Sequence, residues 1–367
     1  MTIQSDRMPL PMTKIRRLDG YKIPVWLQTI QVVVDQISYL EKARSLYGDI
    51  FQAKLAGFPP FVILGHPEAV ERVFLANPDC FDSAVTNKIL QPFVGDRSVV
   101  IIDGFAHRQR RKLLMPPFHG ERMRAYGRTI CQITELVSRK WSDEKPFLMQ
   151  AATNEITLRV IMRAVFGVEK NSRFQQLREL TSKTVNSFNS PLMSSILLFF
   201  KFWQRNLGFW SPWGKFRWRM EQIDEIIFGE IRQRQNQPPG EDILSLMMAA
   251  RDEEGKAMTE IELRDELITL LFGGHETTAS ALAWAFYWIH RYPEVRERLL
   301  EELNSVDPET DPTAIAKLPY LNAVCSETLR IYPVLLFTFG RLLKVPMEIM
   351  GYYFEAGTLL QPYRLRC

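Results

Sequence analysis

The sequence is poor in cysteine, and its few cysteines are not grouped. The 367 residues contain four, at Cys80, Cys131, Cys325 and Cys367, and no two of them have the spacing of a zinc site or a disulfide framework. We therefore expect no metal site built from cysteine pairs and no disulfide-stabilised fold. A reducing cytoplasm is the location that fits this usage of cysteine.

Long apolar runs are also missing. Residues 1–24 are interrupted by seven charged residues, so they contain neither the apolar core of a secretory signal nor a membrane span. The longest apolar block elsewhere, Leu192–Phe200, is too short to cross a bilayer, because a spanning helix needs about 20 apolar residues. The sequence therefore predicts no transmembrane segment.

An excess of charge of one sign is missing as well. The 46 basic and 42 acidic residues leave a formal charge of +4, which is too small to indicate a nucleic-acid partner. A hydrophobic content of 46% with 24% charged residues is typical of a globular protein. No shift in composition divides the chain, so we expect one domain over residues 1–367.

Helical periodicity dominates, with a few strands at the two ends of the chain. Ile50–Leu55 and Phe61–Leu64, separated by Gly57 and Pro59-Pro60, are expected to form a β-hairpin. Strand-like residues return at Met347–Leu360. The predicted helices are Ile37–Tyr47, one starting at His66-Pro67-Glu68, His107–Met115, Glu121–Trp141, Glu155–Phe166, Phe174–Phe188, Lys215–Gln233, Glu241–Arg251, Glu262–Arg291, Glu294–Leu303 and Leu321–Ile331. The fold class is therefore mainly α with a small β lobe.

The longest predicted helix has polar and small residues where a core helix needs neither. Residues 273–278 read Gly-Gly-His-Glu-Thr-Thr between two apolar runs. Each glycine costs a helix about 1 kcal/mol relative to alanine, and a buried glutamate costs more unless it is paired or reaches water. Adjacent glycines can open a local distortion, where a small molecule fits beside a hydroxyl and a proton source.

A second motif, Glu327-Thr328-Leu329-Arg330, places a glutamate and an arginine three residues apart on one helix face, where they can pair. Alone it indicates little, since such pairs are usually solvated.

Together the two motifs resemble those of the cytochrome P-450 family, the haem-thiolate monooxygenases. Residues 273–278 match the family pattern [Ala/Gly]-Gly-x-[Asp/Glu]-Thr-[Thr/Ser], and residues 327–330 match its Glu-x-x-Arg helix. Residues 47–51, 115–120 and 242–246 also resemble family segments, so the likeness covers essentially the whole chain. It implies the P-450 fold, a haem cofactor, and hydroxylation of a lipophilic substrate such as a fatty acid or terpenoid. The electron donor would be a ferredoxin-like or flavin-containing protein.

The resemblance also implies roles for single residues in the long helix. Thr277 would hydrogen-bond dioxygen at the haem, and Glu276 would help to relay protons to it. Gly273 and Gly274 would leave room for oxygen against the haem face.

Other residues would hold the haem or the region behind it. His107 and Arg111, four residues apart on one helix face, match the family's propionate-binding pattern, and Arg341 resembles its further propionate-binding arginine. Glu327 and Arg330 would be a structural pair behind the haem.

Some of these residues have simpler explanations. His275-Glu276 could begin the zinc-protease motif His-Glu-x-x-His, but Ala279 stands where the second histidine is needed, so we reject that reading. In the basic run 107–112, Arg108, Arg110 and Lys112 are expected to be solvated, or else to face an acidic electron donor.

The block Phe199–Trp218 interleaves aromatic and basic residues. Its tryptophans, Trp203, Trp210, Trp213 and Trp218, suit a membrane interface or a stacking platform for single-stranded nucleic acid. The family resemblance favours the mouth of a substrate channel, with peripheral membrane contact. Ordinary amphipathic helices packed on the core fit equally well.

The cysteine that ligates iron in the family comes from a Phe-x-x-Gly-x-x-x-Cys-x-Gly loop, and this sequence has no such loop. Cys80 lacks flanking glycines, Cys131 and Cys325 fall in predicted helices, and Cys367 is the last residue. We therefore expect an incomplete haem-monooxygenase domain, truncated before the cysteine loop and inactive as it stands. The alternative is a non-catalytic helical protein that binds a lipophile without functional haem.

Overall fold

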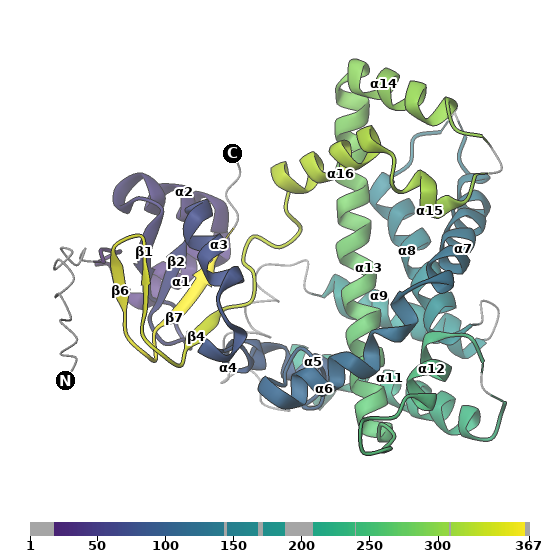
Figure 1. Cartoon of the computed structure of the whole chain (residues 1–367), viewed down its shortest axis with the longest axis horizontal. Helices are drawn as coiled ribbons and strands as arrows, with labels where there is room; N and C mark the ends of the chain where they lie inside the picture. Colours follow the sequence, from purple (N-terminus) through teal and green to yellow (C-terminus); the bar gives the residue numbers. More distant parts are fainter. Residues whose placement is uncertain are drawn as a thin grey trace, which may run out of the picture. The chain divides into compact units, whose positions relative to one another are not determined.

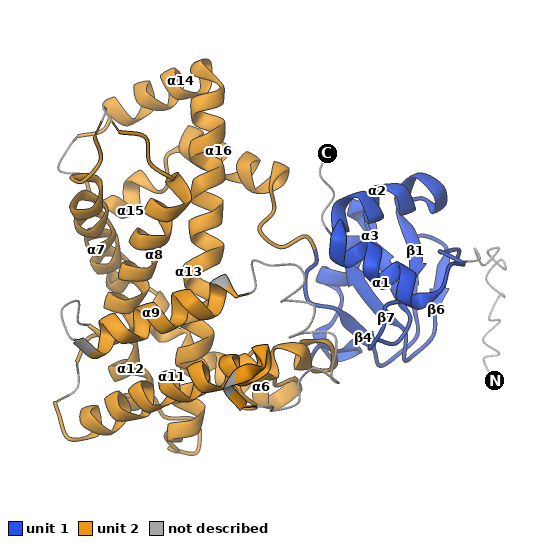
Figure 2. Ribbon diagram, turned by 180° about the vertical axis from the view of Figure 1, so that it is seen from behind, with its two compact units in different colours: residues 1–83, 337–363 blue, residues 84–336, 364–367 orange. Residues whose placement is uncertain are grey.

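The structure is a computed structural model that describes residues 18–142, 145–167, 172–187, 208–238, 240–307 and 310–363. The chain divides into two compact units, shown in blue and orange in Figure 2. The first comprises residues 1–83 and 337–363, and the second comprises residues 84–336 and 364–367. The first unit contains the described β-sheets and the second is helical, so the predicted class, mainly α with a small β lobe, is confirmed.

The first unit is built on a five-stranded sheet whose strands come from both ends of the chain. Its order is β1-β2-β7-β4-β3, and only the β2–β7 pairing is parallel. The strands are β1 (Ile50–Ala53), β2 (Phe61–Leu64), β3 (Phe81–Asp82), β4 (Arg341–Leu343) and β7 (Leu359–Pro362). Ile50 pairs with Leu64 and Ala53 with Phe61, which confirms the predicted hairpin.

Three helices and a second hairpin complete the first unit. The helices are α1 (Val25–Val34), α2 (Gln36–Tyr47) and α3 (Pro67–Leu75), and the hairpin joins β5 (Met347–Ile349) to β6 (Tyr352–Phe354). Its two turn residues, Met350 and Gly351, have φ angles of 51° and 77°. Two left-handed residues are what a two-residue hairpin turn of matching twist requires. Of the helices, α1 was not predicted.

The second unit consists of helices around one long central helix, α13 (Glu260–Arg291), which is the tall green helix in Figure 1. Its other longer helices are α6 (Gly104–Leu114), α7 (Glu121–Ser138), α8 (Met149–Phe166), α9 (Ser172–Asn186), α11 (Pro212–Gln235), α12 (Ile243–Ala249), α14 (Pro293–Asn304) and α16 (Pro319–Ile331). Short turns of helix in this unit lie at α4 (Ala84–Asn87), α5 (Gln91–Val94), α15 (Pro312–Ile315), η2 (Lys88–Leu90), η3 (Pro116–Phe118) and η5 (Gly208–Trp210), and one further turn, η1 (Pro78–Cys80), lies in the first unit.

The core of the second unit lies between α8, α11 and α13. Phe166 of α8, Ile223 and Ile227 of α11, and Leu267 and Leu271 of α13 are fully buried in one cluster. Residues four apart on one helix share a face, so each helix gives one apolar stripe to this core. The predicted helix positions in this region are confirmed to within a few residues at most ends.

Helix α13 runs unbroken through its two glycines. Thr259 and Glu262 form the predicted capping box, each side chain bonding the other's backbone N–H. The local distortion expected at Gly273-Gly274 is not present, so that expectation was wrong. Helix α8 packs closely alongside α13 at this level, with Ile161 against Gly274, and tertiary packing of this kind holds a helix together despite weak local propensity.

Candidate functional site

The two glycines of α13 face different surroundings. A Cβ added to Gly274 would stand 3.0 Å from Ile161 Cδ1 of α8, so Gly274 lets the two helices approach closely. A Cβ added to Gly273 would meet no described atom within 4 Å outside its own helix turn. Gly273 therefore leaves an open strip on α13, and Gly274 is a packing contact.

Thr277 lies one turn after Gly273, beside this open strip. Its hydroxyl donates a hydrogen bond of 2.5 Å to the Gly273 carbonyl oxygen. Thr277 is half-buried, and Thr278 after it is exposed. With its proton held by Gly273, the Thr277 oxygen keeps its lone pairs free to accept a hydrogen bond from a molecule in the strip.

Glu276 is half-buried beside Thr277, and burial raises the pKa of its carboxyl group. The neutral form is therefore favoured more than in water, and a neutral carboxyl can donate a proton. His275 Nδ1 lies 3.9 Å from Glu276 Oε2. Because burial also lowers the pKa of His275, both groups are pushed toward their neutral forms, and we do not regard this contact as an ion pair.

His275 is almost completely buried between α13 and α8. Neither ring nitrogen has a hydrogen-bond partner among the described residues, and Asn154 Oδ1 of α8 is also buried and unpaired. Burial lowers the pKa of the His275 imidazole, and the backbone of Asn154 opposes that shift. These unpaired atoms are polar groups buried where α8 packs against α13.

Helix α6 carries the two predicted propionate ligands. His107 is half-buried and Arg111 is exposed one turn later. The Arg111 side chain forms no hydrogen bond or ion pair with the residues that the structure describes, so its guanidinium is available to an anion.

Arg341 lies in the first unit, on β4, whereas the other predicted haem contacts lie in the second. Arg341 Nη1 donates to Ser83 Oγ at 2.9 Å, and its guanidinium lies 5.9 Å from the centre of the Phe74 ring. Within the first unit its side chain is therefore oriented by these two neighbours.

The Glu327–Arg330 pair forms as predicted, on α16. Arg330 Nε and Nη2 each donate to a different Glu327 carboxylate oxygen at 2.6 Å. The hydrogen bond from Arg330 lowers the pKa of Glu327. Both side chains are about half exposed in the described structure, and their structural role behind a haem stays a prediction.

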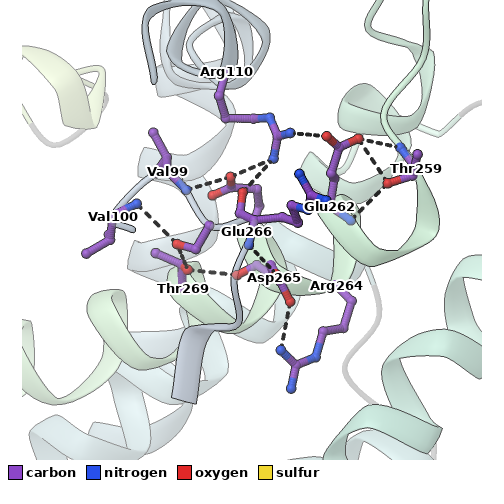
Figure 3. Close-up of polar contacts among 11 residues, drawn as sticks. Val99, Val100, Arg110, Thr259, Glu262, Arg264, Asp265, Glu266 and Thr269 are labelled. Carbon is purple, nitrogen blue, oxygen red and sulfur yellow. Dashed lines mark hydrogen bonds and ion pairs between the residues drawn. The ribbon is translucent and has the colours of Figure 1, made fainter. Parts of the chain in front are cut away.

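Arg110 is not solvated, contrary to the prediction for this basic run. It is 8% exposed and inserts between two glutamates of α13 (Figure 3). Arg110 Nη1 donates to Glu266 Oε1 at 3.0 Å and to the Arg97 carbonyl oxygen at 2.9 Å, and Nη2 bonds Glu262. A buried carboxylate needs a counter-charge, and Glu266 attracts Arg110 into the core for this reason. By contrast, Lys112 is exposed and pairs with Glu253, and Arg108 is exposed.

The same carboxylates hold the loop before α6 against α13 (Figure 3). The backbone N–H of Arg97 donates to Asp265 Oδ2 and that of Val99 to Glu266 Oε1, both at 2.8 Å. Burial raises the pKa of Glu266 to about 7, although Arg110 opposes the shift. Sequence reasoning did not find this network. Its signal was the pair Asp265-Glu266 between the apolar residues of a core helix.

The tryptophan block divides between core and surface. Trp213 is buried with its ring centre 5.3 Å from that of Phe216, whereas Trp210 and Trp218 are exposed. Trp203 lies outside the described residues. Of the three tryptophans that the structure describes in this block, core packing accounts for Trp213.

The described ranges contain neither a candidate metal site nor a helix that could span a membrane. Within them, no group of three or more histidine, cysteine or acidic residues could hold a metal ion. Within the same ranges, no helix is both long and apolar enough to span a membrane. The described cysteines, Cys80, Cys131 and Cys325, are free thiols.

Comparison with known proteins gives one consistent result. The family model described as cytochrome P450 matches residues 19–366. The putative cytochrome P450 135B1 of Mycobacterium tuberculosis is 33% identical over 349 residues, which cover 94% of this chain and 71% of the relative. The putative cytochrome P450 135A1 of the same species is 29% identical, with coverages of 93% and 73%. Among solved structures, the retinoic acid-bound cyanobacterial CYP120A1 has a similar fold, with a TM-score of 0.79 at 24% identity over 94% of this chain and 76% of that one.

Proposed function

Because the chain belongs to the cytochrome P450 family of haem monooxygenases, we propose that the open strip of α13 is the oxygen side of a haem site, where a lipophilic molecule is hydroxylated. A fatty acid or a terpenoid is the substrate class that we propose. The observation that carries the proposal is the Gly273–Thr277 arrangement, an open helix face beside a hydroxyl and a carboxyl of raised pKa.

The side chains near this strip fit a haem on its oxygen side. Gly273 leaves room against the helix, and the hydroxyl and carboxyl groups beside it are only half-buried. His107 and Arg111 would hold propionates from α6, and Arg341 would be a further propionate ligand. The haem would supply the iron at which dioxygen is activated.

The protein's own part in the reaction is the control of protons. Glu276 would keep its proton to a higher pH than a solvated glutamate does, since burial raises the pKa of its carboxyl group. Thr277 Oγ1 would accept a hydrogen bond from the reacting molecule, because its own proton is held by Gly273 O. A proton passing from Glu276 to the open strip would then arrive beside the Thr277 oxygen.

Electrons would come from a ferredoxin-like or flavin-containing protein. An acidic donor suits the exposed cations of α6 that are not assigned to the haem, Arg108 and Lys112. Free thiols at all three described cysteines suit a reducing compartment such as the cytoplasm.

The described cysteines do not lie in a loop of the kind that ligates haem iron in the family. Cys80 lies in the short turn η1, and Cys131 and Cys325 are exposed on α7 and α16, so none of these three has the glycine-flanked loop of a haem thiolate. Our proposal for the 367 residues by themselves is therefore an inactive protein. The second candidate function, binding of a lipophile without functional haem, rests on this same observation.

The carbon monoxide difference spectrum of the reduced, purified protein tests these proposals. A thiolate-type Soret band would contradict the proposed inactivity and support a catalytic site. If haem added to the protein binds without that band, and Arg111→Ala weakens binding, the haem site is supported without the thiolate. If no haem binds while a fatty acid still does, the second candidate function is supported.

A further inference from the structure

His275 of α13 is a buried polar side chain to which the proposed function gives no task. It is 2% exposed, and neither of its ring nitrogens has a hydrogen-bond partner among the described residues. The side-chain oxygen of Asn154, on α8, is buried and unpaired as well. An unpaired buried polar group is costly, and folded proteins contain few of them. Three such atoms on two residues of one helix interface therefore point to a shared role.

Packing holds His275 and Asn154 beside each other. Thr153 Oγ1 of α8 donates a hydrogen bond to the Ala279 carbonyl oxygen of α13 at 3.0 Å. Ala279 follows His275 by four residues and so lies on the same face of α13, one turn away. The backbone of Asn154 opposes the lowering of the His275 pKa, which places Asn154 next to the ring. The two side chains are thus kept together by contacts on either side of them.

The Nδ1 side of the His275 ring faces Glu276. Nδ1 lies 3.9 Å from Glu276 Oε2, which is about 1 Å longer than a hydrogen bond. The Glu276 side chain is 26% exposed, so it has room to rotate about its own bonds and close this gap. Among the described residues, no third charged side chain contributes to the pKa shift of either group. No other ion pair therefore competes for His275 or for Glu276.

The donors and acceptors of the three residues fit together in one direction only. A neutral imidazole has one donor and one acceptor nitrogen. Asn154 Oδ1 can only accept, and since Nδ1 lies beside Glu276, Nε2 is the nitrogen left to donate to it. Nδ1 is then the acceptor, and a carboxyl group can donate to it only when protonated. Burial raises the pKa of Glu276 and lowers that of His275, so both shifts favour the neutral forms that this arrangement needs.

We propose that His275 is a positioning residue, which joins Asn154 to Glu276 in one hydrogen-bonded chain across the interface of α8 and α13. Asn154 Oδ1 accepts from Nε2–H and so fixes the tautomer of the ring, and Nδ1 accepts from the protonated carboxyl group of Glu276. The chain holds this proton in a defined place beside the open strip of α13. The inference rests on the proposed role of Glu276 as a proton source and adds the group that holds its proton.

Nitrogen NMR of the full chain, with isotope-labelled histidine and without haem, tests the proposal. The sequence contains five histidines, and the spectrum of His275→Phe identifies the His275 signals by their loss. We expect a single tautomer, protonated at Nε2 alone, that stays neutral at a pH where solvated histidines are charged. Protonation at Nδ1, a mixture of tautomers or a charged ring at neutral pH would overturn the proposal. This measurement needs only the wild-type protein.

Substitutions at both ends of the chain distinguish it from simple burial. Asn154→Leu removes the acceptor at similar size, so both tautomers should become populated, whereas Asn154→Asp keeps an acceptor and should retain Nε2–H. His275→Phe should weaken proton binding by Glu276 about tenfold, because the protonated carboxyl group loses its acceptor. The titration of Glu276 is followed by infrared spectra recorded as differences from those of Glu276→Gln.

Thr278→Ala is the matched control, since Thr278 is exposed on the same turn of α13, and it should change neither readout. An unchanged tautomer in Asn154→Leu would overturn the proposal, as would an unchanged titration of Glu276 in His275→Phe. All of these readouts are made without haem. A missing carbon monoxide band would therefore contradict the proposed haem site and leave this chain of hydrogen bonds unaffected.

Discussion

Arg110 of α6 and Glu266 of α13 form a buried ion pair, with 3.0 Å between Nη1 and Oε1 and exposed fractions of 8% and 1%. The pair joins the loop at Arg97–Val99 to the helix that carries Thr277. Together with the Arg110–Glu262 contact, it links α6, where we propose that a haem is held, to α13, where we propose that oxygen is activated.

Removal of one member of this pair should be strongly destabilising. Arg110→Met leaves Glu266 buried without its counter-charge, and we expect a loss of about 3–5 kcal/mol in the free energy of unfolding. Adding Glu266→Gln to that variant should recover part of the loss, because the amide is neutral. Urea unfolding of the wild type, the two single variants and the double variant measures the coupling. Simple addition of the two single effects would mean that the pair is not coupled.

Glu266 should make the stability depend on pH. Its pKa is raised from 4.5 to about 7 on folding, so the folded state binds the proton more tightly than the unfolded state. The contribution of Glu266 is therefore full below about pH 4.5 and is lost as pH rises through about 7. The loss amounts to about 3 kcal/mol, since a tenfold change in proton affinity corresponds to about 1.4 kcal/mol. Glu266→Gln should abolish this pH dependence of the urea unfolding midpoint. The exposed control Glu327→Gln should retain it.

His275 should make the protein less stable in acid, whereas Glu266 makes it less stable as pH rises. Burial lowers its pKa below the usual 6.5, so the folded state binds its proton less tightly than the unfolded state. Stability from the neutral imidazole is present above pH 6.5 and is lost as pH falls through the folded pKa. His275→Phe should flatten the acid side of the stability profile. An unchanged profile would show that folding does not lower the pKa of His275, as expected for a solvated imidazole.

The two glycines should respond differently to alanine. Gly273→Ala adds a methyl group in open space and should stabilise the helix by about 0.5–1 kcal/mol. Gly274→Ala places the methyl group against Ile161, and crowding of about 1–3 kcal/mol should outweigh the gain in helix propensity. Thermal unfolding of the two variants gives the comparison. Equal effects would contradict the two surroundings described above.

Haem affinity should depend on α6. Arg111→Ala and His107→Ala should each weaken haem binding about tenfold, since each removes one charged or polar contact to a propionate. Titration of the protein with haem, followed by absorbance, measures the affinity. Arg108→Ala is the control, because Arg108 is an exposed cation of the same helix with no proposed haem contact. A matching loss in the control would indicate only a general effect of charge.

Features that depend on near neighbours in the chain could be predicted from the sequence. The capping box of Thr259 and Glu262, the β1–β2 hairpin and the Glu327–Arg330 pair all formed as expected. Each is made by residues close together in sequence, so spacing and residue type suffice to identify it. Family motifs likewise lie within short segments, which is why they identified the family.

Features that depend on what packs against a residue were decided by the tertiary structure. Arg110 lies in a basic run that predicts a solvated side chain, but Glu262 and Glu266, 152 and 156 positions away, bind it in the core. Gly273 and Gly274 are neighbours of the same type, yet α8 covers one and leaves the other open. The apolar side chains of α1 face outward because Gln28 and Thr29 accept hydrogen bonds from Tyr39 of α2 and from backbone N–H groups just after β1. Burial and partner choice are set by contacts distant in the chain, and a local pattern carries no record of them.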